Sequence, residues 1–227
     1  MKGKYGKFVV IEGTDGSGKK TQTKLLESRL ENEGFGTKVI DFPRYGEKSC
    51  YFVEKYLQGG FGGSNDVGPK KASLFYALDR LDHSKQIKDW LQEGKVVIGD
   101  RYTTSNMGHQ TGKIEKDEDK DNFLEWVSEL EYDICGNPVP DIVVLLVVSP
   151  EISFKMVGER KEAKDTIGTK RDIHELDFDH MKRAYDAYLY VAKKFGWIII
   201  DCAPTGEILS REEIHNLVWE KVSGVFK

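Results

Sequence analysis

Hydrophobic residues gather in short, nearly continuous runs, and longer segments between the runs carry apolar residues at helical spacing. The predicted strands cover residues 7–12, 37–41, 95–100, 141–148 and 197–201. The run at 141–148 is too continuously apolar to be half-exposed, which predicts a strand buried on both faces, as in a parallel sheet. Because strands alternate with helical segments over 227 residues, the pattern predicts one α/β domain spanning residues 1–227.

The predicted helix over residues 70–93 presents two sets of side chains. Leu74, Leu78 and Leu81 follow one another at i, i+4 and i+7, which predicts the stripe that faces the core. Tyr76 and Arg80 also lie four residues apart, but on a different face. An aromatic plane beside a guanidinium on an exposed wall suits a planar, hydrogen-bonding base, although a cation–π surface pair would have the same spacing.

A glycine-rich stretch, Gly13-Thr14-Asp15-Gly16-Ser17-Gly18-Lys19, joins the first apolar run to the first predicted helix. This arrangement is typical of a P-loop, in which backbone N–H groups and the helix N-terminus converge on phosphate oxygens. Lys19 would then span the β- and γ-phosphates of a nucleotide. The next position is Lys20, where a P-loop usually has the Ser or Thr that binds Mg²⁺, and Thr21 follows one residue late. A plain turn between two elements is disfavoured because two adjacent lysines would repel each other without an anion.

Polar residues also follow the second and third predicted strands. Pro43 ends the second strand and directs Arg44 beyond its carboxyl end, where ligands of open α/β sheets bind. Asp100 ends the third strand, a placement that resembles a Walker B carboxylate holding Mg²⁺, and Arg101 comes next. A plain salt bridge is the alternative for that pair. Further candidate contacts at this edge are Ser105, Asn106 and His109.

The second half of the chain carries fewer chemical signals. Residues 113–122 are predicted to be a charged, solvated stretch, followed by an amphipathic helix marked by Phe123, Val127 and Leu130, in which no chemistry is visible. Residues 158–171 contain five basic side chains and form either a solvated loop or a lid that closes over phosphates. Capping patterns predict helix starts at Ser149 and at Ser210.

Composition narrows the functional classes. A formal net charge of −4 argues against wholesale binding to nucleic acid. Cys50, Cys135 and Cys202 have no metal-site spacing and leave an odd thiol, which favours a reducing cytoplasm. The longest aliphatic run, residues 142–148, has the length of a buried strand, so no membrane-spanning or targeting segment is predicted.

Taken together, the motifs resemble those of thymidylate kinase, a family of nucleoside monophosphate kinases. The likeness rests on the loop at residues 13–19, Phe-Pro-Arg at 42–44, Tyr76 ahead of Asp-Arg at 79–80, the segment DRYTTSN at 100–106, and a basic segment before DIHE at 172–175. It implies a three-layer α/β/α P-loop kinase with a five-stranded parallel sheet flanked by helices and a small lid at about residues 158–172. It also implies a homodimer that transfers the γ-phosphoryl group of ATP to dTMP, giving dTDP and ADP, by direct in-line transfer with Mg²⁺ in dTTP biosynthesis.

The resemblance also implies roles for individual residues. Tyr76 would stack on thymine, Arg80 would bond its O4, and Asp15 and Asp100 would hold the metal. The ATP site would comprise Gly13, Thr14, Asp15, Gly16, Ser17, Gly18, Lys19, Lys20 and Thr21. The dTMP site would comprise Asp15, Arg44, Tyr76, Arg80, Arg101, Ser105, Asn106, His109, Asp172 and His174. The catalytic groups would be Lys19, Asp100, Arg101 and Arg160.

Three positions depart from the family pattern, namely Lys20, His109 and His174. His109 stands where a tyrosine commonly guards against a ribose 2′-hydroxyl, so selectivity for deoxyribose is open. Two other functions also stay open. One is a kinase of the same fold that acts on another nucleotide or a deoxynucleoside, and the other is a nucleotide-dependent switch protein, although the guanine-specific N-K-x-D motif does not occur.

Overall fold

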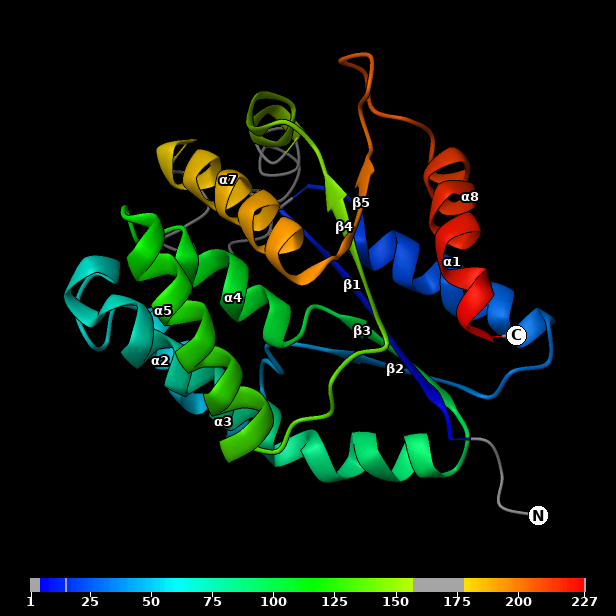
Figure 1. Cartoon of the computed structure of the whole chain (residues 1–227), viewed down its shortest axis with the longest axis horizontal. Coiled ribbons are helices and arrows are strands. Elements are labelled where there is room, and N and C mark those ends of the chain that lie inside the picture. The colour runs from blue at the N-terminus through cyan, green and yellow to red at the C-terminus, as the bar shows by residue number, and fades with distance from the viewer. Residues whose placement is uncertain (1–4, 15, 157–177, 227) are drawn as a thin grey trace.

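The computed structural model describes residues 5–14, 16–156 and 178–226, and within these ranges the chain forms a five-stranded sheet in which every pairing is parallel (Figure 1). The strands are β1 Lys7–Gly13, β2 Thr37–Asp41, β3 Val96–Asp100, β4 Ile142–Val147 and β5 Ile198–Asp201. Each predicted strand is confirmed to within one residue at either end.

The strand order β2-β3-β1-β4-β5 places β1 at the centre of the sheet. Val9 of β1 pairs with Ile98 on one side and with Ile142 on the other. The chain passes from β1 outward to β2, fills the gap with β3, and then crosses to β4 on the opposite side. The carboxyl end of β1 is therefore the point at which the strand order reverses, which is where open α/β sheets bind ligands.

Helices cover both faces of the sheet, which confirms the three-layer fold (Figure 1). One layer contains α1 (Lys19–Asn32) and α8 (Arg211–Val222), which pack against Val9 and Ile11 of β1. The other contains α3 (Ser64–Gln92), α4 (Thr103–Thr111), α5 (Asp117–Ser128) and α7 (Phe178–Phe195). Shorter elements are η1 Lys48–Cys50, α2 Tyr51–Leu57, η2 Glu129–Ile134 and η4 Ser223–Phe226.

The predicted helix caps are confirmed. At the start of α8, the Ser210 backbone N–H donates to Glu213 Oε2 over 2.8 Å and the Glu213 N–H donates to Ser210 Oγ over 3.2 Å. Residues 150–156 are helical, and Ser149 Oγ accepts from the Ile152 N–H at 3.5 Å. These local signals succeed because a cap needs only residues close in sequence.

The predicted core stripe of α3 is wrong. Leu74, Leu78 and Leu81 are 43–46% exposed, on the side of the helix turned away from the core. The inward stripe has the same helical spacing but is partly polar; it contains Ser73, Ala77, Arg80, Ser84, Ile87 and Leu91. Helical spacing identifies a shared face, but the face that turns inward on α3 includes the polar residues Ser73, Arg80 and Ser84.

The charged segment at residues 113–122 includes the start of a helix. It is predicted to be solvated, and residues 115–119 are exposed, while α5 begins at Asp117. Its first turn contains Asp117, Glu118 and Asp119. Their negative charges stabilise the helix by interacting with the partial positive charge at its N-terminus. The charge run therefore marks the start of a helix.

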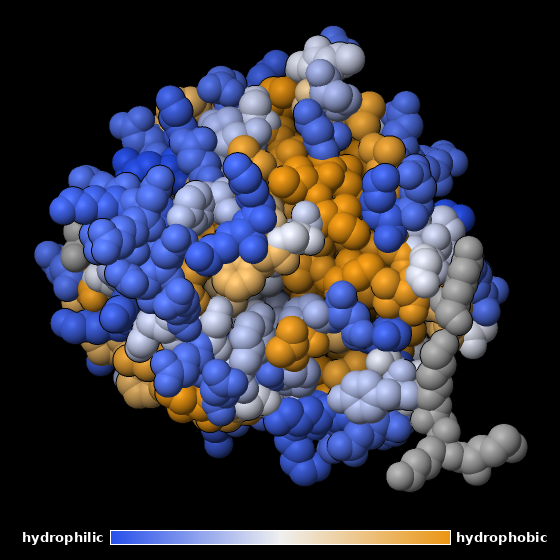
Figure 2. Space-filling view, in the orientation of Figure 1, coloured by the Kyte–Doolittle hydropathy of each residue, from blue (hydrophilic) through white to orange (hydrophobic). Residues whose placement is uncertain are grey.

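Hydrophobic residues also appear on the surface near the β5 edge of the sheet. Figure 2 shows them as a band over the region where Figure 1 draws β4 and β5, between α7 and α8. Ile199 of β5 is one large apolar residue that is exposed. In the described part of the chain, no helix combines the length and apolar character required to cross a bilayer.

Candidate active site

A cavity of about 280 Å³ opens at the carboxyl end of the sheet. Residues just beyond β1, β2, β3 and β4 all contribute to its wall, namely Thr14, Phe42, Arg101 and Val148. The sequence-predicted residues that line it are Thr14, Tyr76, Arg80, Arg101, Ser105, Asn106 and His109. The fold thus brings together side chains from the loop after β1, from α3, and from the segment after β3.

The glycine-rich loop connects β1 to α1 as predicted. Gly16 and Gly18 have φ angles of 81° and 87°, in the left-handed region that glycine adopts without strain. Lys19 is the first residue of α1 and is buried, and its Nζ donates to the Thr14 carbonyl over 2.9 Å. Lys20 is exposed, so the second lysine points away from the buried part of the loop.

The same loop contains hydroxyls whose hydrogen-bonding capacity is unused. Thr14 Oγ1 and Ser17 Oγ are buried and have no hydrogen-bond partner among the described residues. Buried hydroxyls normally find a partner, so their presence in a loop rich in backbone N–H groups fits a site built for a polar ligand.

Asp100 lies next to this loop, because it pairs with Ile11 near the end of β1. Burial raises the pKa of the Asp100 carboxyl; Lys19 and Arg101 lower it, Glu12 and Asp41 raise it further, and the net shift is upward. Burial therefore makes the ionised form of Asp100 costly, and a divalent cation would stabilise that form. The donor is a carboxylate oxygen, which suits Mg²⁺.

The described residues contain no cluster of three or more His, Cys, Asp and Glu side chains that could enclose a metal ion by themselves.

Arg101 projects into the middle of the cavity from a strained backbone. Its φ of 67° is unusual for a residue other than glycine, and such strain concentrates at functional sites. Its Nη1 lies 3.0 Å from His109 Nε2, 3.5 Å from Ser105 Oγ and 3.8 Å from Glu12 Oε1. A guanidinium can only donate, so His109 Nε2 accepts in this arrangement.

Glu12 is a site residue that the sequence analysis missed. It is completely buried and accepts hydrogen bonds from the Gly13 N–H (3.0 Å), Thr104 Oγ1 (2.8 Å), Ser105 Oγ (2.7 Å) and the Tyr188 hydroxyl (3.1 Å). Burial raises the pKa of Tyr188 well above its ordinary value, and the Glu12 charge adds to the shift. The available signal was one acid inside the otherwise apolar run of β1.

Close packing of α4 against α7 allows Tyr188 to reach Glu12. A Cβ added at Gly108 would overlap ring carbons of Tyr188. Gly108 is therefore needed for the approach of the two helices.

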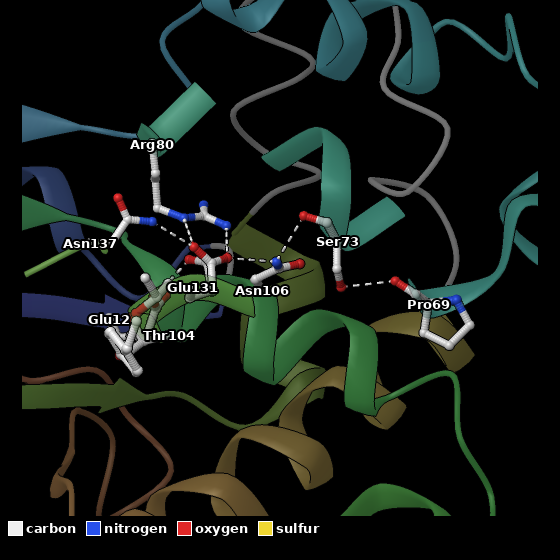
Figure 3. A network of polar contacts seen from close by, with 11 residues as sticks. Glu12, Pro69, Ser73, Arg80, Thr104, Asn106, Glu131 and Asn137 are labelled. Atoms are coloured by element: carbon white, nitrogen blue, oxygen red, sulfur yellow. Dashed lines mark hydrogen bonds and ion pairs between the residues drawn. The ribbon is translucent and has the colours of Figure 1, made fainter. Parts of the chain in front are cut away.

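Arg80 and Tyr76 form the other end of the cavity, one helical turn apart on α3. The prediction that they stand on an exposed wall is wrong for Arg80, which is 2% exposed. Its guanidinium turns inward to the Glu131 carboxylate, with Nε donating to Oε2 over 3.0 Å and Nη2 bonded to Oε1 (Figure 3). Burial lowers the pKa of Arg80, but Glu131 raises it, and the net shift is upward.

Glu131 is the second site residue that the sequence analysis missed. It lies in η2, a π-helical turn that continues from α5, and it is completely buried. It follows Val127 by four residues, so the signal was an acid on the apolar face of the predicted amphipathic helix. That helix was predicted to have no chemistry, which is wrong because Glu131 holds a residue that lines the cavity.

Comparison with known proteins identifies the family. The family model described as thymidylate kinase matches residues 11–213, which is most of the chain. The chain belongs to the thymidylate kinase family.

Individual thymidylate kinases are similar over nearly their whole length. A probable thymidylate kinase of Methanocaldococcus jannaschii is 34% identical over 209 residues, covering 92% of each chain. The thymidylate kinase of Mycobacterium tuberculosis is 32% identical over 193 residues, covering 84% of this chain and 87% of the relative. The thymidylate kinase of Plasmodium falciparum is 29% identical over 227 residues, covering 98% and 92%.

A solved structure of thymidylate kinase from Candida albicans has the same fold. Its TM-score is 0.71 at 22% identity, with 97% of this chain and 92% of that chain covered. The predicted fold and the predicted family are both confirmed.

Some residues expected of a thymidylate kinase site are not brought to the cavity. Arg44 does not line it; its Nη2 lies 3.7 Å from Glu47 Oε1, and its backbone N–H donates to Asp79. Its neighbours Pro43 and Tyr45 do line the cavity. Further predicted residues that do not line the cavity are Gly13, Gly16, Ser17, Gly18, Lys19, Lys20, Thr21 and Asp100. The predicted residues Asp15, Arg160, Asp172 and His174, and the lid at about 158–172, lie outside the described residues.

Proposed function

We propose that this protein transfers the γ-phosphoryl group of ATP to dTMP, giving dTDP and ADP in dTTP biosynthesis. The observation that carries the proposal is one cavity in which Thr14 of the glycine-rich loop, the Arg101 guanidinium and the pair Tyr76 and Arg80 all face the same space. The Arg101 guanidinium, together with the Tyr76 ring and the fixed Arg80 guanidinium, matches an acceptor that has both a phosphate and a base, and the adjoining glycine-rich loop matches the phosphates of the donor.

The donor nucleotide would bind at the loop. Lys19 and the N-terminus of α1 would attract the β- and γ-phosphates. The buried hydroxyls of Thr14 and Ser17, which have no partner among the described residues, could donate hydrogen bonds to phosphate oxygens. Asp100 would hold Mg²⁺, which neutralises charge on the phosphate oxygens when bound. We assign Gly13, Gly16, Gly18, Lys20, Thr21 and Asp15 to the same site on the family pattern.

The acceptor would bind in the cavity with its phosphate toward Arg101. Tyr76 would stack on the base and Arg80 would donate to it, while Ser105, Asn106 and His109 complete the wall. The phosphate of dTMP is anionic near neutral pH, so the transfer needs positioning and charge neutralisation, with no phospho-enzyme. From the family pattern we also assign Arg44, Arg160, Asp172 and His174 to this reaction, as part of one domain whose lid spans about residues 158–172.

We also propose that two copies of the chain form a homodimer through α3. Leu74, Leu78 and Leu81 form an exposed apolar stripe along this helix, and a second copy would cover it. Light scattering should give twice the 25.8 kDa chain mass for the wild type and one chain mass for Leu78→Lys, if the stripe is the interface. A cytoplasmic location is proposed from the three cysteines, which form no disulfide.

An acceptor panel tests the reaction. Purified protein with ATP and Mg²⁺ would be offered dTMP, dUMP, dCMP, dGMP and thymidine, with ADP release coupled to a detector and products identified by mass. The proposal expects dTDP as the main product and no product with Lys19→Ala. Preference for another acceptor would support a different kinase of this fold, and slow ATP hydrolysis without dTDP would support a switch protein.

A further inference from the structure

The Glu131 carboxylate has more hydrogen-bond donors around it than a simple ion pair would need. Oε2 accepts from Arg80 Nε (3.0 Å) and from Asn137 Nδ2 (2.9 Å), while Oε1 accepts from Arg80 Nη2 and from Asn106 Nδ2 (2.9 Å) (Figure 3). Each carboxylate oxygen therefore uses both of its lone-pair positions. Arg80 and Asn106 line the cavity, whereas Glu131 does not.

This arrangement determines which end of the Asn106 amide faces Glu131. The amide nitrogen lies 2.9 Å from Glu131 Oε1 and 3.2 Å from the Ser73 carbonyl oxygen. Both neighbours can only accept hydrogen bonds, so the NH₂ end must face them. Asn106 Oδ1 is then turned the other way, and it is buried without a partner among the described residues. The site therefore offers a fixed acceptor.

The same carboxylate determines which donor Arg80 has left. Nε and Nη2 are both used by Glu131, and none of the hydrogen bonds of the described residues uses Nη1. Because Arg80 also lines the cavity, its remaining N–H groups form a fixed donor in the same cavity wall as Asn106. Neither group can turn away without breaking bonds to Glu131.

We propose that Glu131 is a positioning residue that sets base selectivity by holding Arg80 as a donor and Asn106 as an acceptor. This pair complements the edge of a 4-keto pyrimidine, whose O4 accepts and whose N3–H donates. A 4-amino pyrimidine presents the reverse pattern, an amino donor at C4 and an acceptor at N3, and leaves buried groups unpaired. The inference deepens the proposed function, on which it rests, and Glu131 itself does not touch the base.

The chemistry of Glu131→Gln makes it the sharpest test. A glutamine has one acceptor oxygen, so its NH₂ group must face two donors, on either the Asn106 side or the Asn137 side. Arg80 loses a hydrogen bond in both cases. If the new NH₂ group faces Asn106, the Asn106 amide is favoured to turn over so that its oxygen accepts from that group. A residue with a merely structural role would lower stability and leave the choice between bases unchanged.

The experiment compares kcat and KM for dTMP and dCMP, with ATP and Mg²⁺, in three full-length proteins. These are the wild type, Glu131→Gln, and Glu129→Gln, an identical chemical change at an exposed position of the same turn. We expect Glu131→Gln to lower the ratio of kcat/KM for dTMP over dCMP by roughly tenfold to a hundredfold, mainly through a higher KM for dTMP. Glu129→Gln should keep the wild-type ratio.

A folded Glu131→Gln that keeps the wild-type ratio overturns the inference but leaves the proposed function intact. A wild type that does not phosphorylate dTMP overturns both. Should Glu131→Gln not fold, a crystal structure of the wild type with dTMP decides. Support would be Arg80 Nη1 at O4 and Asn106 Oδ1 at N3 with the Glu131 contacts retained, and a base bound by other groups would refute it.

Discussion

Two buried carboxylates stand at the two ends of the cavity, and the same short helix serves both. Thr104 and Ser105 of α4 donate to Glu12, and the next residue, Asn106, donates to Glu131. The two acids differ in their cations. Glu131 is in contact with Arg80, whereas Glu12 is surrounded by hydroxyl and backbone donors.

The cation nearest Glu12 is Arg101, 3.8 Å away and partly exposed. Because the Arg101 side chain is partly exposed and lines the cavity, it can contact an incoming anion, while the Arg80 guanidinium cannot leave Glu131 without stranding a buried charge. Under the proposed function, the part of the cavity that binds the base would be preformed, and the part that binds the phosphate would have a cation able to contact it.

The largest expected effect comes from removing the available cation. Arg101→Ala should lower kcat for dTMP phosphorylation by about a thousandfold, roughly 4 kcal/mol of barrier, because charge on the transferred group would go unneutralised. Steady-state kinetics and urea unfolding of the same protein would separate catalysis from stability. Lys85→Ala, an exposed change on α3, serves as the control, and a loss under tenfold for Arg101→Ala would break the comparison.

Removing the fixed cation should lower stability as well as substrate binding. Arg80→Met leaves Glu131 buried without its cation and should lower the free energy of unfolding by about 3–5 kcal/mol. Changing both residues, Arg80→Met with Glu131→Met, should recover much of that loss because no unpaired charge remains. Urea denaturation measures both proteins, and a single variant as stable as the double variant would contradict the argument.

Neutralising Glu12 should lower the free energy of unfolding by less than the removal of Arg80 does. In Glu12→Gln the new NH₂ group can face Thr104 and Ser105, whose hydroxyls can rotate to accept, so we expect a loss of about 1–2 kcal/mol in urea unfolding. Glu12→Leu is the matched comparison, since it strands the same hydroxyls and should be clearly less stable. Equal stability of the two variants would show that the hydrogen bonds to Glu12 contribute little.

A small pH effect belongs to neither carboxylate. Burial, and then the charge of Arg29, lower the pKa of His215 in α8 below its ordinary 6.5. As pH falls below 6.5 the unfolded chain takes up a proton that the folded protein resists, so stability should decline. The unfolding temperature should fall less between pH 7.5 and pH 5.5 in His215→Gln than in the wild type. An equal fall in the two proteins would exclude His215 as the source.

Features set by nearby residues were predicted from sequence. All five strands, the helix caps at Ser149 and Ser210, and the glycine-rich loop after β1 depend on local pattern. The cavity also contains many of the expected ligand-binding residues, because the carboxyl ends of parallel strands meet at one edge.

The errors have a common physical cause. Spacing along α3 did not reveal that its leucines face outward, because the inner stripe has the same helical spacing and is partly polar. Glu12 and Glu131 each leave the signal of an acid among apolar residues, but their donors come from segments as distant in sequence as Tyr188 and Arg80. A buried acid is acceptable only with such partners, and partners of this kind are found only once the chain is folded.

The contact between Gly108 and Tyr188 restricts how this enzyme could change over evolution or in the laboratory. With no room for even a methyl group at this position, a library randomised at codon 108 and selected for growth should return glycine alone.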